Sequence, residues 1–479
     1  MKLSFGVGAA MLAGTANLAA AQGIQHDAEH YILLSQHGEA WATEEAVVDA
    51  KLAELRAANG GKPPNIVYVL IDDMGFGEFG MPELNKIRGG KTPNLDAFAE
   101  EAMTFTRYYA ENICTPTRVS FMTGRYAVRT GMELTKVTPP EGVGLAGDEV
   151  TIAELLTEAG YTTHHIGKWH MGDIKESYPI SQGFDWASFP MHNQVSYSFL
   201  TRDAEIQSRT TSFTPEGLDS DYALDKSFRL YDWVTLVDAY VGELLDEIDA
   251  LGIADNTIVM VMGDNGPMKQ EIPDSGYSEW LFRGTKGSAL EGGHRVGAFL
   301  RWPGVIEGGS IAGDMVFVGD LYTTFARIAG NMDGIPTDRV VDGVDQTALL
   351  VNGDTHGRRD YIHLYEVNKL AATVKQNMKI RWPGPGVNPS LAEVYNLYWD
   401  PREEHPLKRE GVWTGTPFSR MLTQHQRLKD KYPDRKPATG MPYEDVENIR
   451  PETVEMLELW QQTYGDARDV ILGVEAAGN

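Results

Sequence analysis

Two stretches of the chain combine an unbroken apolar run with acidic residues at its end. Residues 66–71 (IVYVLI) are apolar and rich in β-branched side chains, and two aspartates follow them. Residues 257–262 (TIVMVM) repeat the design and lead, one glycine later, into an aspartate and an asparagine. Short continuous apolar runs are typical of strands that are buried on both faces of a sheet. We therefore predict two buried strands, each ending in polar side chains.

Helical patterns lie between these two strands. Residues 151–160 (TIAELLTEAG) and 231–252 (YDWVTLVDAYVGELLDEIDALG) repeat apolar side chains at helical spacing, and each ends at a glycine, which favours helix termination. Strands that alternate with helices predict an α/β fold with a large, mostly parallel sheet flanked by helices. In such sheets ligands bind outside the carboxyl ends of the strands. The polar residues that end the two strands therefore predict a binding site.

Changes in composition and in the apolar pattern divide the chain after residue 21 into three parts. Residues 22–62 read as a helical lead-in, with helical spacing over 32–59, and a linker ended by glycines and prolines. We expect the main α/β domain over 63–354. Residues 355–479 carry Trp, Pro and Tyr clusters and shorter patterns. They predict a smaller C-terminal α+β subdomain with a short antiparallel sheet and a helical, acidic tail.

The first 21 residues predict export. Residues 1–21 contain an early lysine, a run of small apolar residues and three alanines before Gln22, the pattern of a secretory signal peptide that is cut near Ala21. Asn17 interrupts the run, which is too short for a retained span of about 20 apolar residues. We expect a periplasmic or secreted protein whose mature chain has no membrane span.

The net charge of the chain argues against one class of binding partner. The chain has 42 Lys and Arg residues against 68 Asp and Glu residues, a formal net charge of -26. Such a surface repels phosphate backbones, which argues against nucleic acid as a partner. A small anionic substrate would need a locally basic pocket.

The polar residues at the two strand ends form a candidate metal site. They are three carboxylates and one amide: Asp72, Asp73, Asp264 and Asn265. Oxygen ligands of this kind suit a hard cation such as Ca²⁺ or Mg²⁺. A single pair would be explained more simply as a turn. Two pairs, each closing a buried strand, favour a metal site.

The chain has one cysteine, Cys114, which therefore has no disulfide partner within the chain. It is followed by Thr-Pro-Thr-Arg, and proline is common in the first turn of a helix. A helix that starts here places Cys114 at its positive end and Arg118 beside the same pocket, where both could act on an anion. For an arbitrary cysteine, a buried and inert side chain would be the simpler explanation.

The segment CTPTRVSFMTGR resembles the sulfatase signature, Cys-x-Pro-x-Arg followed by Thr-Gly-Arg. Further blocks are similar to those of this family and occur in its order: IVYVLIDDMGFGEFG, GKWHMG, MGDNGP, FRGTKGSALEGGHRVGAFLRWPG and VYNLYWDPREEHPL. The resemblance runs from about Pro64 to about Leu407. It implies an alkaline phosphatase-like fold and an arylsulfatase-like enzyme that cleaves a sulfate monoester to an alcohol or phenol and sulfate, with 63–354 as the catalytic domain.

The resemblance also implies that Cys114 is converted to Cα-formylglycine (3-oxoalanine) by a formylglycine-generating enzyme. The hydrated aldehyde would be the nucleophile, because one of its oxygens can attack sulfur while the second later expels sulfate. By position, the four strand-end residues would bind one divalent cation, with modified Cys114 as the fifth ligand. Ca²⁺ is favoured over Mg²⁺.

Further residues receive roles from the same resemblance. Arg118 would orient the formylglycine, and Lys168 and Lys286 would bind the sulfate. His170 would accept the proton that triggers release of sulfate. The chain departs from the family because residues 205–234 lack the histidine that usually protonates the leaving group.

The missing histidine leaves the leaving-group acid open. His192, in the loop SFPMHNQ, is our candidate for this acid, and Lys286 is the competing donor. An equally simple reading of His192 is a loop histidine that bonds nearby backbone.

Two other functions remain open from the sequence. A phosphonate monoester or phosphodiester hydrolase of the same superfamily could share the modified cysteine and the metal site. A catalytically silent protein that binds sulfated ligands is a second alternative, but a pure binder has no need of the intact CTPTR motif. The sequence does not identify the alcohol or phenol that carries the sulfate, because loops build the pocket wall.

Overall fold

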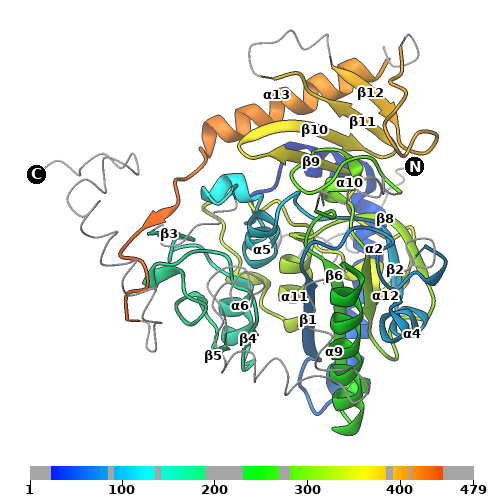
Figure 1. The fold of residues 1–479 in the computed structure, drawn as a ribbon, viewed down its shortest axis with the longest axis vertical. Coiled ribbons are helices and arrows are strands. Elements are labelled where there is room, and N and C mark those ends of the chain that lie inside the picture. Colours follow the sequence, from blue (N-terminus) through cyan, green and yellow to red (C-terminus); the bar gives the residue numbers. More distant parts are fainter. Residues whose placement is uncertain are drawn as a thin grey trace, which may run out of the picture.

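The computed structural model describes residues 23–84, 91–134, 142–188, 230–268, 281–384, 392–408 and 413–445 (Figure 1). Its main sheet has five strands in the order β1-β6-β7-β2-β8. They are β1 (Asn65–Ile71), β6 (Thr257–Gly263), β7 (Ala298–Arg301), β2 (Met103–Tyr109) and β8 (Ile311–Phe317). Only β7 is antiparallel to its neighbours. This mixed, largely parallel sheet confirms the predicted α/β fold.

Helices cover both faces of the sheet, as β6 makes clear. Val259 and Val261 face a cluster that includes side chains of α4 (Pro93–Glu101) and α9 (Leu230–Ala250). The alternate residues of β6 face a larger cluster that includes side chains of the helices on the opposite face, because successive side chains of a strand point to opposite faces. That second layer contains α5 (Cys114–Thr123), α6 (Ile152–Glu158), α11 (Asp320–Ala329) and α12 (Thr347–Asn352).

The two predicted strands differ in burial. Every residue of β6 is buried, as expected. In β1, by contrast, only Ile71 is buried, and most other residues are half-buried. Among the described strands, β1 lies at the end of the sheet and pairs with β6 alone. Both faces of β1 are covered, because Tyr68 packs against one core cluster and Val67 against the other. The burial is only partial, because an apolar run does not reveal the position of a strand in its sheet.

The predicted helices are present. Thr151 begins α6 with a capping box that it forms with Glu154, which satisfies two backbone donors at the helix start. The N-terminal α2 (Ala28–Ala58) begins four residues before the apolar pattern, because the Asp27 side chain accepts a hydrogen bond from the backbone of Glu29. Helix α2 contacts α12 and the C-terminal α13, so it joins two parts of the molecule.

The C-terminal part contains the predicted antiparallel sheet, in the order β12-β11-β10-β9. Figure 1 shows this sheet and α13 (Gly415–Lys431) at the top of the molecule. Its strands are β9 (Tyr361–Glu366), β10 (Lys369–Lys375), β11 (Met378–Arg381) and β12 (Glu393–Asn396). The segment after α13 returns to the main domain, where β13 (Ala438–Thr439) pairs with β3 (Val143–Gly144).

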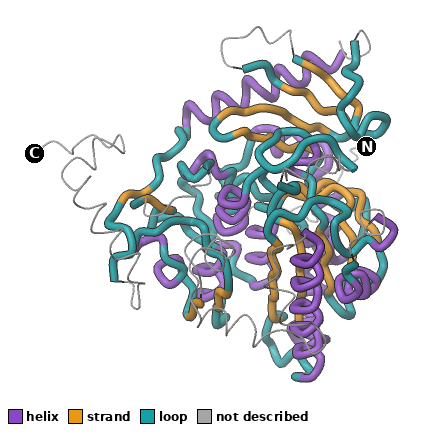
Figure 2. Tube along the Cα trace, in the orientation of Figure 1, coloured by secondary structure: helices purple, strands orange, loops and turns teal. Residues whose placement is uncertain are grey.

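Short elements complete the described structure, and loops connect most of them in the tube view (Figure 2). They are α10 (Glu291–His294), β4 (His164–Ile166), β5 (Trp186–Ser188), η1 (Ala127–Thr130), η2 (Lys175–Ser177), η3 (Ile180–Gln182), η4 (Ala254–Asn256) and η5 (Met332–Gly334). Within the described ranges, no helix has the length and apolar character needed to cross a membrane.

Candidate active site

The candidate site lies where β1 and β6 end. These strands are parallel and in register up to the pair Ile71 and Gly263, so the residues that follow them meet at one edge of the sheet. Asp72, Asp73 and Asp264 lie there together with Cys114, and one ligand atom from each of the four lies within 4.8 Å of the others. The structure thus brings together the carboxylates and the cysteine that the sequence analysis selected.

The two strand ends approach each other closely. A Cβ atom on Gly263 would lie 1.8 Å from the carbonyl oxygen of Met74, so only glycine allows the two loops to pass. Asp73 adopts a left-handed backbone with φ 57, which is uncommon for a residue with a side chain. Its backbone N–H donates to Oδ1 of Asp264 at 2.9 Å. This bond holds the two strand ends in one geometry.

Cys114 is the first residue of α5 and is fully buried. Its sulfur lies 3.0 Å from Nζ of Lys286 and 3.7 Å from Oδ1 of Asp73. The same Lys286 amino group lies 2.6 Å from Oδ1 of Asp73. The helix start, a lysine and a carboxylate therefore converge on the sulfur atom.

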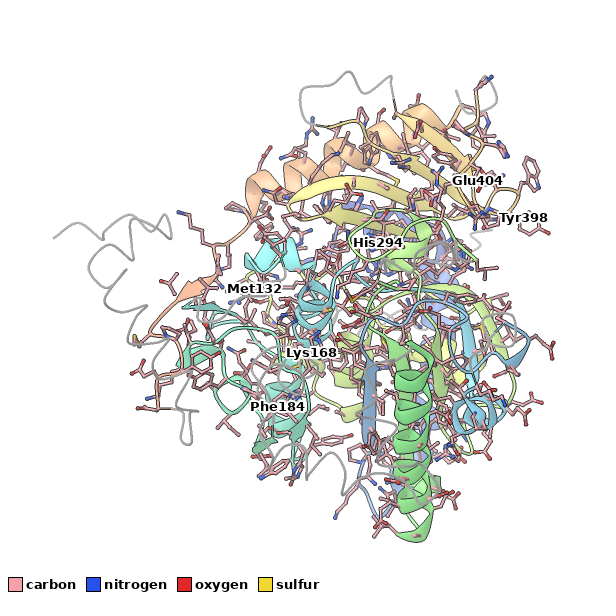
Figure 3. All side chains as sticks on the ribbon, in the orientation of Figure 1. Met132, Lys168, Phe184, His294, Tyr398 and Glu404 are labelled. Atoms are coloured by element: carbon pink, nitrogen blue, oxygen red, sulfur yellow. The ribbon has the colours of Figure 1, made fainter. Side chains whose placement is uncertain are left out.

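Two further cations lie at the same place, each beside a carboxylate. Nζ of Lys168 lies 2.6 Å from Oδ1 of Asp72. Nη2 of Arg118 lies 3.3 Å from Oδ2 of Asp264 and 3.7 Å from Oδ1 of Asp72. Figure 3 labels Lys168 in the central part of the molecule, near α5. With Lys286, three cationic side chains thus lie among the three carboxylates of the site.

Burial and the neighbouring charges shift the pKa values of the groups in the site. Burial alone would raise the pKa of Asp72, but Lys168 and Arg118 hold that pKa well below its ordinary value. Burial, and then the charge of Asp72, raises the pKa of Asp264 to about 7. Burial and then Asp264 and Asp72 raise the pKa of the Cys114 thiol well above its ordinary value.

The donor set fits a divalent cation. Nδ2 of Asn265 donates to Oδ1 of Asp73 at 2.8 Å and to the carbonyl oxygen of Gly266 at 2.7 Å. Oδ1 of Asn265 is buried and has no hydrogen-bond partner, although an unpaired buried acceptor is costly. A hard cation among the carboxylates would use this oxygen as a ligand. Asn265 therefore belongs with the strand-end aspartates as a candidate ligand.

Two threonines of the CTPTR segment, which the sequence analysis did not select, connect the site. Thr115 Oγ1 donates to the carbonyl oxygen of His170 at 2.8 Å, and Thr117 Oγ1 donates to that of Asp264 at 2.5 Å. Nη1 of Arg118 likewise donates to the carbonyl oxygen of Lys168 at 2.6 Å. These bonds connect the first turn of α5 to the loop of Lys168 and His170 and to the end of β6. In the sequence, the only signal for the two threonines was their place between Cys114 and Arg118.

Of the two candidate histidines, His170 and His192, only His170 lies within the described residues. His170 is 5% exposed and has a left-handed backbone with φ 62. Its loop thus lies next to the start of α5, through the bond to Thr115. His192 lies outside the described residues, so its role as leaving-group acid stays a prediction.

Known proteins resemble this chain over most of its length. A family model described as Sulfatase matches residues 64–231 and 191–331. N-acetylgalactosamine-6-sulfatase of Mus musculus is 32% identical over 441 residues, covering 74% of this chain and 84% of that protein. Arylsulfatase A of Homo sapiens is 30% identical over 357 residues, covering 60% of this chain and 68% of that protein.

The fold agrees with these matches. The crystal structure of the PsFucS1 sulfatase from Pseudoalteromonas sp. has a TM-score of 0.69 and 25% identity, and the match covers 83% of this chain and 96% of that one. The chain therefore belongs to the sulfatase family and is a sulfuric ester hydrolase with an alkaline phosphatase-like fold.

Proposed function

We propose that this protein is an exported, arylsulfatase-like enzyme that cleaves a sulfate monoester through a formylglycine formed from Cys114. The observation that carries the proposal is the position of the Cys114 sulfur, which lies 3.0 Å from the amino group of Lys286 and in one group with the carboxylates at the ends of β1 and β6. A nucleophile made from this residue would stand where cation-binding oxygens and sulfate-binding amines meet.

The proposed reaction has two steps. In the first, one hydroxyl oxygen of the hydrated aldehyde passes its proton to a neighbouring carboxylate of the site and forms a bond to the sulfur of the substrate. The bond from sulfur to the alcohol oxygen breaks, and the alcohol leaves with a proton from His192 or Lys286. In the second, His170 takes the proton of the remaining hydroxyl, the bond from carbon to the sulfate oxygen breaks, and the aldehyde re-forms. Water then restores the hydrate.

Charge stabilisation comes from residues already grouped in the site. Asp72, Asp73, Asp264, Asn265 and modified Cys114 would hold Ca²⁺, which supplies positive charge beside the nucleophile and the sulfate oxygens. Lys168 and Lys286 would bind the remaining sulfate oxygens, and Arg118 would orient the formylglycine. Such preorganised charges stabilise the transition state without reorganising during the reaction.

A sulfated sugar is the proposed substrate class. N-acetylgalactosamine-6-sulfatase of Mus musculus, at 32% identity, supports a 6-sulfated amino sugar. The test compares kcat/KM for N-acetylgalactosamine 6-sulfate, 4-nitrophenyl sulfate and a phenylphosphonate monoester. We expect both sulfates to be hydrolysed faster than the phosphonate, and N-acetylgalactosamine 6-sulfate to be hydrolysed faster than 4-nitrophenyl sulfate. Preference for the phosphonate would favour a phosphonate monoester hydrolase, and tight binding of sulfated sugars without turnover would favour a silent binding protein.

Export is proposed from the leader sequence alone, because residues 1–22 lie outside the described structure. Removal of the leader near Ala21 would leave a mature periplasmic or secreted chain. Mass spectrometry of the N-terminal peptide, after cell fractionation of the producing host, tests this. An uncut leader on protein found only in the cytosol would contradict it.

A further inference from the structure

A second cluster of metal-ligand side chains lies between the N-terminal helix and the C-terminal subdomain. Asp27 precedes α2, His363 belongs to β9 and His425 belongs to α13. All three are buried, and one ligand atom from each lies within 4.8 Å of the others. None of these elements contributes a residue to the candidate active site.

Both histidines present one ring nitrogen to Asp27. Nδ1 of His425 lies 2.7 Å from Oδ2 of Asp27, and Nε2 of His363 lies 3.9 Å from the same oxygen. The other nitrogen of each ring contacts a hydroxyl group: Nδ1 of His363 lies 3.0 Å from Oγ1 of Thr373, and Nε2 of His425 bonds the hydroxyl of Tyr365. Outer hydrogen bonds of this kind orient histidines that bind metals.

An unpaired atom points into this cluster. Nε2 of His363 is buried without a hydrogen-bond partner, and the residue is 1% exposed. In the tautomer that is protonated at Nδ1, where the ring donates to Oγ1 of Thr373, Nε2 keeps a lone pair. Oδ1 of Asp27 is occupied by the backbone N–H of Glu29, which leaves Oδ2 for the cluster. A buried lone pair beside a carboxylate oxygen suits a cation.

The surroundings carry little net charge. Arg129 and Arg359, which act on His363 electrostatically, are paired with acidic partners. Arg129 Nε lies 2.7 Å from Oδ2 of Asp342, and Arg359 Nη2 lies 2.6 Å from Oδ1 of Asp320. These pairs offset the repulsion that the two guanidinium groups would exert on a bound cation.

We propose that Asp27, His363 and His425 bind one divalent transition-metal ion in a structural site, with Zn²⁺ as the ion that this donor set favours. Imidazole nitrogens and a carboxylate oxygen are common Zn²⁺ ligands, and a water completes a tetrahedral set. The active-site residues offer mainly oxygen donors and favour a harder cation. The bound ion fastens α2 to β9 and α13, and thus the N-terminal helix to the C-terminal subdomain.

The test uses the full mature chain with its active site saturated by Ca²⁺ after chelator treatment. Co²⁺ is titrated as a coloured probe, and Zn²⁺ is then added as a competitor. We expect one Co²⁺ per chain with the visible absorption of a four-coordinate ion, displaced by Zn²⁺. Absence of these bands in the wild-type protein would overturn the proposal and leave the cluster as a hydrogen-bonded clamp.

Variants locate the bound ion. His363→Gln and His425→Gln keep polar side chains but lose a ligand nitrogen, and each should weaken Co²⁺ binding by about a hundredfold or more. The matched control is His294→Gln, because His294 is also a fully buried histidine but lies outside the cluster. Equal binding by the wild type and both cluster variants would overturn the assignment.

A more conservative variant tests the same proposal if the two glutamine variants do not fold. Tyr365→Phe keeps the buried ring and removes only the hydroxyl that contacts Nε2 of His425. We expect Co²⁺ affinity to fall by about tenfold, while the far-UV circular dichroism spectrum stays that of the wild type. An unchanged affinity in Tyr365→Phe would contradict the proposal.

Discussion

Nζ of Lys286 lies 3.0 Å from the sulfur of Cys114, although the two residues are 172 positions apart in the chain. Two backbone bonds hold the lysine loop in place. The N–H of Lys286 donates to the carbonyl oxygen of Pro267 at 2.9 Å, and the N–H of Gly287 donates to that of Asn112 at 2.7 Å. The loop is thus fastened both to the segment after β6 and to the segment before α5. A positive charge is thereby fixed beside the proposed nucleophile.

Removal of that charge should slow every sulfate ester. We expect Lys286→Ala to lower kcat/KM by about a hundredfold to a thousandfold on both activated and poorly activated sulfates, because one preorganised positive group is lost. Steady-state kinetics measure this, with Lys175→Ala as the control for an exposed lysine. A loss confined to poorly activated esters would make Lys286 the leaving-group acid and would refute a role limited to sulfate binding.

His192 has a different expected signature. A general acid matters most when the departing oxygen is basic, so His192→Ala should slow alkyl sulfates and poorly activated phenyl sulfates by about a hundredfold while sparing 4-nitrophenyl sulfate. The measurement is kcat/KM across a series of leaving groups. Equal effects on all esters, or none on any, would remove His192 from the mechanism.

Metal removal should abolish turnover. Chelation of the purified enzyme followed by Ca²⁺ addition is expected to eliminate and then restore activity, because three carboxylates and one amide converge on one place. Asp264→Asn keeps the shape of the buried side chain and removes its charge, so bound Ca²⁺ and activity should fall together. Elemental analysis beside the activity assay measures both, and full activity in a metal-free sample would sink the assignment.

A buried carboxyl group should make stability depend on pH. Burial raises the pKa of Glu111 from 4.5 to about 7, so between these values the folded chain binds more protons than the unfolded chain and stability falls as pH rises. Glu111→Gln removes this loss. The melting temperature of Glu111→Gln minus that of the wild type should therefore increase between pH 5 and pH 8. The increase corresponds to at most about 3 kcal/mol in the free energy of unfolding.

The control for this prediction is Glu100→Gln, which changes an exposed glutamate. Both variants are compared with the wild type in saturating Ca²⁺, so that the metal site does not contribute to the difference. If the difference in melting temperature between Glu111→Gln and the wild type stays constant over this pH range, Glu111 titrates at its ordinary pKa and the prediction is wrong.

Local patterns predicted the centre of the molecule. The buried strand β6 and the carboxylates after two strands follow from apolar runs of a few positions. The start of a helix at Cys114 follows from the proline two residues later. The half-buried state of β1 was not predictable, because it depends on which strands become neighbours. The bonds of Thr115 and Thr117 depend on loops that only the fold brings near.

The cluster around Asp27 shows the same limit. Asp27 and His425 are 398 positions apart, and no spacing in the sequence connects them with His363. The active-site residues could be selected because each lies in a short motif of its own. Ligands contributed singly by a helix start, a strand and a second helix carry no such signal, so only the folded structure brings them to notice.

The central claim is that Cys114 becomes formylglycine, and peptide mass spectrometry across Glu111–Ala127 tests it most directly. The protein should be made in a host that has the formylglycine-generating enzyme, and the peptide should be measured on the same preparation that is assayed for activity. The account predicts a peptide in which an aldehyde, trapped as its hydrazone, replaces the thiol, in a proportion that follows specific activity. An active preparation whose Cys114 peptide carries only the unmodified thiol would contradict it.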